Sequence, residues 1–291
     1  MKVDIIASDG LVLKALYSKA SHPKAVVVIV HGMVEHKERY NELIEKLNDN
    51  GYTAIIADLR GHGESINDEY QLGMIGDIDL MVEDVKSVID YAKEDNPTLR
   101  INMFAHSMGS LIARMFIRKY SNLIDRLVLS GTVAYKFGCG LGASIAKSKS
   151  KGEGKNNYSK LLFKLSNGGS SKEDYSWLSY NKKNIEYYEN DPLCGFKFTN
   201  FSNYVLFDMT HKLHKHDKEL KVNENLRIIS LSGIDDRTTS GTKGVKDSIK
   251  HLEKDGFKYL SFKEYPKMKH EILKEDNKKE VFKDIVKFYN E

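Results

Sequence analysis

The chain has 291 residues, of which 41% are hydrophobic and 30% are charged, and its formal net charge is +4. This length and composition are typical of one large globular α/β domain with a sizeable core. The small net charge, without a lysine- or arginine-rich block interleaved with aromatic residues, argues against a nucleic-acid-binding protein. Two cysteines, Cys139 and Cys194, are too few for the disulfide framework of a small secreted protein, so we expect reduced thiols.

The amino terminus carries no targeting signal that the sequence makes visible. Met1 to Ile6 enters a strand pattern at once and contains no apolar signal-peptide block. No run approaches the roughly 20 apolar residues that a membrane-spanning helix needs. We therefore expect a cytoplasmic protein. Abundant lysine, asparagine and isoleucine with only four prolines indicate an AT-rich, bacterial coding genome.

Short apolar runs alternate with helical patterns along most of the chain. The expected strands are residues 3–7, 11–17, 25–30, 53–57, 101–104, 127–130, 227–232 and 259–262, and helical patterns lie near 40–50, 78–89 and 111–116. This alternation predicts a mostly parallel sheet with helices on both faces.

The alternation stops between residues 132 and 221. Glycine, serine, asparagine and lysine gather over residues 138–155, and aromatic residues follow from Trp177 to Phe207. We expect residues 1–131 and 222–291 to form the α/β core and residues 132–221 to form an inserted lid. The alternative is a second structural layer whose aromatic residues fill only its own core.

The segment Ala105 to Gly109, with the sequence AHSMG, lies between an apolar strand pattern and a helical pattern. A serine on such a sharp strand-to-helix turn is a nucleophile elbow, which exposes its hydroxyl above the sheet. Small residues flank the serine because the turn brings strand and helix close together, and alanine replaces the first glycine of the G-x-S-x-G pattern here. Ser107 is therefore the candidate nucleophile.

A serine hydroxyl needs a histidine to take its proton and a carboxylate to orient that histidine. In this arrangement the acid and then the histidine follow the serine along the chain. Asp235 and Asp236 follow one predicted strand, and His270 follows the next. The carboxyl ends of neighbouring strands meet where open α/β sheets bind ligands. The pattern thus favours Ser107, His270 and one of the two aspartates.

The other histidines fit different roles. His251 lies in a helical stretch with a solvated face. His211, His214 and His216 precede the acid and have no cysteine or carboxylate nearby at ligand spacing, so they predict the surface end of a helix rather than a metal site. His106 is expected to pack beneath the elbow. We expect no metal and no organic cofactor.

The negative charge that develops on a carbonyl oxygen during acyl transfer needs hydrogen-bond donors. In proteins with such an elbow, the donors are the backbone N–H of the residue after the serine and a backbone N–H in the loop after the third strand. His31-Gly32-Met33 follows the third predicted strand directly. The backbone N–H groups of Met33 and Met108 are therefore the expected oxyanion donors.

Several segments in order along the chain resemble the monoacylglycerol lipase and lysophospholipase branch of the α/β-hydrolases, the serine aminopeptidase S33 type. They are His31 to Tyr40, Asp58 to Ser65, Ala105 to Gly109, Asp191 to Phe196 and Tyr265 to Leu273. The resemblance implies the α/β-hydrolase fold and a serine ester hydrolase that cleaves a single acyl chain from a monoacylglycerol or lysophospholipid.

The same family pattern bears on the choice of acid. In the family, the acid stands three residues after the glycine of the Ser-Gly turn, which implies Asp236 rather than Asp235. Many relatives have proline and valine after that acid, whereas Arg237 and Thr238 stand here.

Other functions remain open at this point. Neighbouring branches of the fold cleave short esters, thioesters or amino-terminal peptide bonds with the same triad. A peptidase needs a carboxylate for the substrate's ammonium group, and the expected lid offers Glu173, Asp174, Glu186 and Glu189. A non-catalytic ligand-binding protein predicts a broken triad, which this chain does not have. The expected partners are a small lipid-like ester and, through the lid, transiently a membrane surface.

Overall fold

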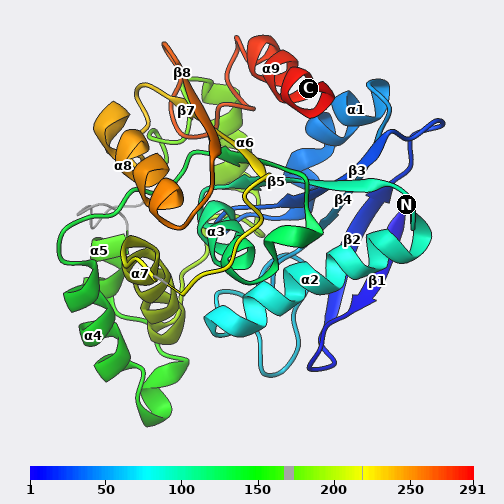
Figure 1. The fold of residues 1–291 in the computed structure, drawn as a ribbon. Coiled ribbons are helices and arrows are strands. Elements are labelled where there is room, and N and C mark those ends of the chain that lie inside the picture. The colour runs from blue at the N-terminus through cyan, green and yellow to red at the C-terminus, as the bar shows by residue number, and fades with distance from the viewer. Residues whose placement is uncertain (167–173, 218) are drawn as a thin grey trace.

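The structure, a computed structural model, describes residues 1–166, 174–217 and 219–291. Its strands form one sheet in the order β1-β2-β4-β3-β5-β6-β7-β8 (Figure 1). The strands are β1 (Lys2–Ile6), β2 (Val12–Ser18), β3 (Ala25–Val30), β4 (Tyr52–Ala57), β5 (Arg100–His106), β6 (Arg126–Ser130), β7 (Arg227–Gly233) and β8 (Tyr259–Tyr265). Strand β2 runs antiparallel to β1 and β4, and the other neighbouring strands are parallel. The predicted mostly parallel sheet is confirmed.

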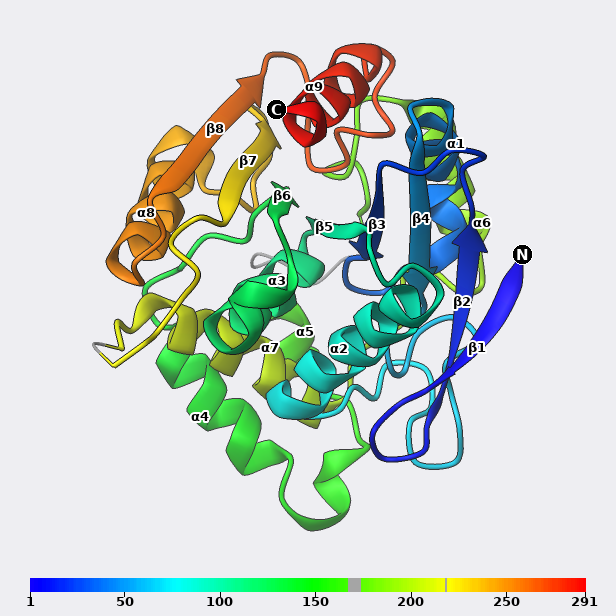
Figure 2. The same cartoon turned by 45° about the vertical axis from the view of Figure 1, so that its right-hand side comes forward.

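Helices cover both faces of this sheet (Figure 2). They are α1 (Asn41–Asp49), α2 (Ile78–Asp95), α3 (Met108–Tyr120), α8 (Gly241–Lys254) and α9 (Lys279–Asn290), with short 3₁₀ turns at Lys37–Tyr40, Ser121–Leu123 and Gly152–Lys155. One apolar cluster joins α1 and α9 to the sheet, and another joins α2, α3 and α8 to its opposite face. The chain therefore has the α/β-hydrolase architecture that the sequence predicted.

Strand β3 shows why an unbroken apolar run belongs in the centre of the sheet. Val26, Val28 and Val30 pack toward α2 and α3, whereas Val27 and Ile29 pack toward α1 and α9. Side chains alternate between the two faces of a strand, and each face here is covered by helices. Every residue of β3 is consequently buried.

The segment between β6 and β7, residues 131–226 and called the insertion below, contains four further helices within its described part. They are α4 (Cys139–Lys149), α5 (Lys160–Ser166), α6 (Lys182–Asn190) and α7 (Asn200–His214). Helices α4, α5 and α7 lie together on the side of the molecule away from α1 and α9 (Figures 1 and 2). Among the helices in the described ranges, none has both the length and the apolar character needed to cross a bilayer.

The turn from β5 into α3 has the geometry of a nucleophile elbow. Ser107 has φ 52° and ψ −119°, a backbone conformation that a non-glycine residue adopts only when its surroundings enforce it. The flanking positions explain the need for small residues. A Cβ on Gly109 would lie 2.4 Å from the carbonyl oxygen of Val30 and 2.6 Å from that of His31.

We expect Gly109→Ala to lower the free energy of unfolding by about 1–3 kcal/mol, because the added methyl group meets two backbone oxygens that cannot move aside easily. Urea denaturation of the two proteins measures this difference. The matched control is Gly142→Ala in α4, where the nearest atom to the new Cβ is a ring carbon of Phe207 at 3.5 Å. That variant should be as stable as the wild type or slightly more stable, and equal behaviour of the two variants would contradict the crowding at the elbow.

Candidate active site

Ser107, His270 and Asp236 meet above the carboxyl ends of β5, β7 and β8. The Oγ of Ser107 lies 2.8 Å from Nε2 of His270, and Nδ1 of His270 lies 2.8 Å from Oδ2 of Asp236. In the tautomer with the proton on Nδ1, the histidine accepts from the serine hydroxyl and donates to the carboxylate. His270 and Asp236 are buried, while Ser107 is partly accessible. The structure thus brings together the three residues that the sequence selected.

The second oxygen of Asp236 is also held in place. Thr238 donates to Oδ1 through both its backbone N–H and its hydroxyl, each at 2.7 Å. From the sequence, Thr238 stood out only as a departure from relatives, with no role predicted for it. Asp235 points elsewhere: it is exposed and accepts a 3.0 Å hydrogen bond from the hydroxyl of Tyr180. Only Asp236 of the pair contacts His270.

Burial and charge act in opposite directions on the titration of His270. Burial disfavours the imidazolium, but the charge of Asp236 and its hydrogen bond outweigh burial and raise the pKa of His270 above 6.5. In return, the histidine lowers the pKa of Asp236 below its usual value although burial alone would raise it. The neighbouring His106 differs: burial and the charge of His270 lower its pKa to about 4, and its ring packs 4.6 Å from that of His270. His106 therefore stays neutral and serves as packing beneath the elbow.

The loop after β3 places Met33 beside Ser107. The N–H groups on either side of Met33 are already used, since Gly32 donates to Glu35 Oε1 at 2.6 Å and Val34 donates to His62 Nε2 at 3.2 Å. Met108 is the first residue of α3, so the helix itself does not use its N–H. Met33 and Met108 both line the cavity above Ser107. Met33 and Met108 therefore stay the predicted oxyanion donors.

Val34 has a strained backbone conformation, which hydrogen bonds from the insertion stabilise. Its φ of 52° is unfavourable for a β-branched residue. Its carbonyl oxygen accepts hydrogen bonds from the Gly195 N–H at 2.9 Å and from the Tyr188 hydroxyl at 3.0 Å. Two contacts from the insertion therefore fix the backbone next to Met33.

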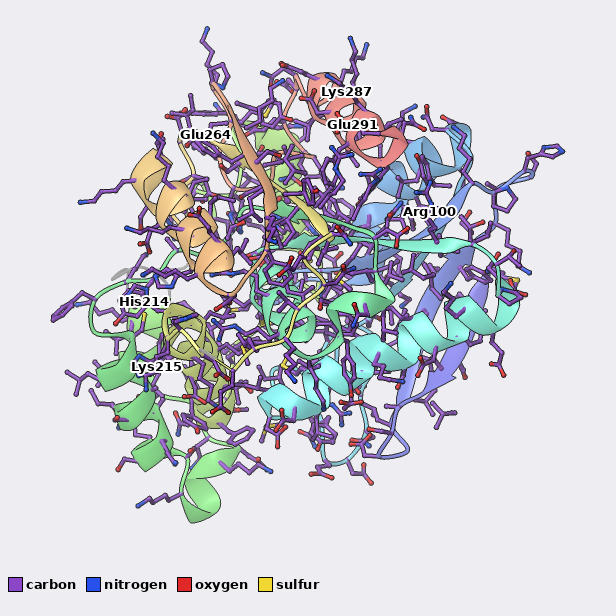
Figure 3. The ribbon with its side chains drawn as sticks, in the orientation of Figure 1. Arg100, His214, Lys215, Glu264, Lys287 and Glu291 are labelled. Atoms are coloured by element: carbon purple, nitrogen blue, oxygen red, sulfur yellow. The ribbon has the colours of Figure 1, made fainter. Side chains whose placement is uncertain are left out.

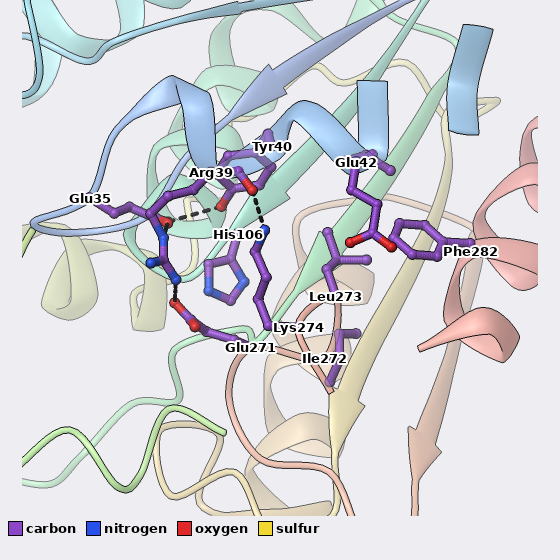
Figure 4. Close-up of a pocket in the computed structure, with 11 residues that line it drawn as sticks. Glu35, Arg39, Tyr40, Glu42, His106, Glu271, Ile272, Leu273, Lys274 and Phe282 are labelled. Atoms are coloured by element: carbon purple, nitrogen blue, oxygen red, sulfur yellow. Dashed lines mark hydrogen bonds and ion pairs between the residues drawn. The ribbon is translucent and has the colours of Figure 1, made fainter. Parts of the chain in front are cut away.

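Glu35, Arg39 and Glu271 form a buried ion triplet, whose two ion pairs are drawn in Figure 4. Arg39 donates from Nε to Glu35 at 3.0 Å and from Nη2 to Glu271 at 2.5 Å. Burial alone would raise the pKa of Glu35, but the charge of Arg39 and the hydrogen bond from the Gly32 N–H lower it to about 2. The second oxygen of Glu271 accepts from Asn184 of α6 at 2.6 Å. The triplet therefore connects the β3 loop, the residue after His270, and the insertion. No sequence pattern predicted a role for these residues.

A cavity of ≈ 500 Å³ opens above Ser107, within the size range of small-molecule sites. Its walls are mostly apolar and come largely from the insertion: Val133, Ala134, Phe137, Cys139, Leu141 and Ile145 around α4, Leu165 of α5, Trp177, and Leu206 and Phe207 of α7. Lys136 and Arg237 are the charged residues of this lining within the described part of the chain. Cys139 and Cys194 are free thiols, as predicted.

Trp177 covers the exposed side of the candidate triad. Its ring lies 5.0 Å from that of His270, and the guanidinium of Arg237 lies 4.5 Å from the indole. Gly131 closes the site from another direction, because a Cβ there would lie 2.9 Å from two atoms of the His270 ring. No signal within the local sequence around Trp177 or Gly131 pointed to these contacts, since both depend on how distant segments pack.

His251 and His36 do not line the cavity above Ser107. His251 is in a helix, as predicted, but it is buried rather than on a solvated face, because α8 turns it toward α3 and α7. His36, Asp191 and Cys194 also come together, yet both ring nitrogens of His36 are occupied by Glu38 at 2.7 Å and Asp191 at 2.8 Å. That cluster ties the insertion to the β3 loop.

A family model described as serine aminopeptidase, S33, matches residues 21–277. The chain belongs to this family. Monoglyceride lipase of Mus musculus is 30% identical over 191 residues, which are 65% of this chain and 59% of that protein. Phospholipase YtpA of Bacillus subtilis is 34% identical over 113 residues, which are 38% of this chain and 42% of that protein. The matched segments thus span less than two thirds of either relative.

Comparison with a solved structure extends the similarity over the whole chain. A thermostable carboxyl esterase from Bacillus coagulans superimposes with a TM-score of 0.87 at 25% identity, covering 100% of this chain and 97% of that one. The α/β-hydrolase fold is therefore confirmed, together with the membership that the sequence motifs indicated.

We expect NMR titration of the His270 ring to give a pKa above 6.5, since the Asp236 charge outweighs burial. In Asp236→Asn the charge is lost while burial remains, so the pKa should fall below that of the wild type. Any activity that needs neutral His270 should then persist to lower pH, although its maximum is reduced. Asp235→Asn is the matched control and should leave the titration unchanged; a shift in this variant instead would overturn the assignment of Asp236.

Proposed function

We propose that the protein is a serine hydrolase that cleaves carboxylic esters of a single acyl chain. The observation that carries the proposal is the hydrogen-bonded series Ser107–His270–Asp236 opening into a mostly apolar cavity. The similarity to monoglyceride lipase, phospholipase and carboxyl esterase supports the same class of substrate.

In the proposed mechanism, Ser107 attacks the ester carbonyl while His270 accepts its proton. Asp236, oriented by Thr238, keeps the imidazole in the required tautomer and stabilises its charged form. The N–H groups of Met33 and Met108 bind the oxyanion, and each such donor contributes about 3 kcal/mol to transition-state stabilisation. His270 then protonates the leaving alcohol, and a water activated by the same histidine hydrolyses the acyl-enzyme.

The cavity lining favours an ester over a peptide with a free amino terminus. An ammonium group needs a carboxylate, and the lining residues in the described ranges include Lys136 and Arg237 but no aspartate or glutamate. Of the acids considered from the sequence, Asp174, Glu186 and Glu189 are exposed, and Glu173 lies outside the described residues. The two cations are compatible with a glycerol or a phosphate-bearing headgroup, so monoacylglycerol and lysophospholipid are both candidate substrates.

We further propose that residues 132–221 act as a lid over a core formed by residues 1–131 and 222–291. Helices α4, α5 and α7 supply much of the cavity wall. Phe137, Leu141, Leu161 and Leu165 expose large apolar side chains on the same helices or beside them. With nearby lysines, such a surface suits transient contact with a lipid interface, from which the substrate would enter.

We expect Ser107→Ala to lower kcat for p-nitrophenyl esters on the order of 10⁶-fold, as for the loss of a triad nucleophile. Ser144→Ala, on an exposed face of α4, is the control and should retain full activity. Steady-state kinetics with both variants, checked for folding by circular dichroism, measure the effect. A kcat of the Ser107→Ala variant close to that of the wild type would contradict the proposed mechanism.

A series of p-nitrophenyl esters from acetate to palmitate tests the substrate class. Wild-type kcat/KM should peak at medium or long chains because the cavity is large and mostly apolar. Ile145→Trp fills part of the cavity and should lower kcat/KM for long esters at least about 10-fold while sparing acetate. Leu161→Trp, at a side chain outside the cavity lining and 48% exposed, is the control. A wild-type peak at acetate would indicate a short-chain esterase, and silence throughout would favour a peptidase or a binding protein.

A further inference from the structure

Helices α7 and α8 bring together two histidines and an aspartate outside the large cavity above Ser107. His214 is the last residue of α7, and Figure 3 shows it beside α8. Asp247 and His251 are one turn apart on α8, so both side chains emerge on one face of that helix. The candidate ligand atoms of the three residues all lie within 4.8 Å of one another.

The distances are close to those of a metal centre. Nδ1 of His214 lies 3.9 Å from Oδ2 of Asp247, and Nε2 of His251 lies 3.9 Å from Oδ1 of the same carboxylate. Nitrogen and oxygen ligands that bind Zn²⁺ at about 2.0–2.2 Å in a tetrahedron are roughly 3.3 Å apart. Small side-chain rotations would therefore bring all three atoms to bonding distance of one ion.

A space of suitable size and an unused ligand atom are already present. A cavity of ≈ 10 Å³, enough for about one water molecule or ion, is lined by His214, Asp247 and His251. Nδ1 of His214 is buried and has no hydrogen-bond partner within the described structure.

We propose that His214, Asp247 and His251 form a binding site for one divalent transition-metal ion, for which Zn²⁺ is the best match. Two imidazoles and one carboxylate are a ligand set that Zn²⁺ accepts, with water completing the coordination. This site lies apart from Ser107 and does not depend on the proposed ester hydrolysis.

Two neighbouring side chains affect metal binding at this site in opposite directions. The ring of Tyr135 stacks on His214 at 3.7 Å with an interplanar angle of 6°, which fixes the orientation of the imidazole. Arg114 of α3 lines the same small cavity, and its positive charge opposes a second cation. We therefore expect affinity in the micromolar range, weaker than that of a zinc finger.

Metal binding here would connect the insertion to the sheet-covering helices. His214 belongs to α7, whereas Asp247 and His251 belong to α8. Val133 and Thr210 line both this small cavity and the large cavity above Ser107. An ion at the site would consequently fix α7, one wall of the large cavity, against the rest of the fold.

Isothermal titration of the chelator-treated full chain with Zn²⁺ tests the site. We expect one ion per chain and, at a hundred-fold excess over Kd, a Tm increase of about 5 °C. Asp247→Asn and His214→Phe should each weaken binding at least about 10-fold, and phenylalanine preserves the stacking on Tyr135. His211→Phe, one turn earlier on α7, is the matched control and should bind Zn²⁺ like the wild type. Substitution with Co²⁺ should give visible absorption bands that vanish in the first two variants only.

Three results would overturn the proposal. They are the absence of stoichiometric Zn²⁺ binding by the wild type, undiminished binding by both ligand variants, and equal loss in His211→Phe, which would mean non-specific binding by surface histidines. Thermal unfolding of each variant in chelator establishes that it is folded before titration. If Asp247→Asn does not fold, His214→Phe alone decides, since it removes no carboxylate and keeps an aromatic ring against Tyr135.

Discussion

Arg39 is buried between Glu35 and Glu271, and this ion triplet holds together the segments that form the site. Glu35 accepts from the Gly32 amide in the loop that carries Met33, and Glu271 follows His270 directly. Burying three charges is costly, but removing one partner would leave an uncompensated charge and cost about 3–5 kcal/mol. The triplet therefore fixes the relative positions of the oxyanion loop and the histidine loop before any substrate binds.

The insertion takes part in the site at two places with different chemistry. Asn184 of α6 donates to Glu271, and Tyr188 of the same helix donates to the carbonyl of Val34. Helix α6 therefore supports the loops that carry His270 and Met33. Helices α4, α5 and α7 instead form the apolar wall above Ser107. If the insertion acts as the proposed lid, its opening would move α4, α5 and α7 while α6 stays attached, and an ion bound by His214 would oppose movement of α7.

Short-range sequence patterns predicted much of the fold and part of the candidate active site. The apolar run of β3, the elbow around Ser107 and the strand ends before Asp236 and His270 are local features, each decided within a few residues. Family motifs then favoured Asp236 over Asp235, and the structure agrees, with Asp236 alone contacting His270. His251 was misread as solvated, because the lysines around it in the sequence do not reveal which helices cover its own side of α8.

The sequence by itself predicted a mostly parallel α/β sheet, Ser107, His270 and one of two aspartates, because hydrophobic periodicity and turn chemistry specify these locally. Its resemblance to a known family added the α/β-hydrolase fold and the choice of Asp236. Only the tertiary structure decided what surrounds them. Trp177 against His270, Thr238 against the second carboxylate oxygen, and the meeting of His214 with Asp247 all depend on side-chain positions. Packing between elements far apart in the chain sets those positions, and no local pattern encodes them.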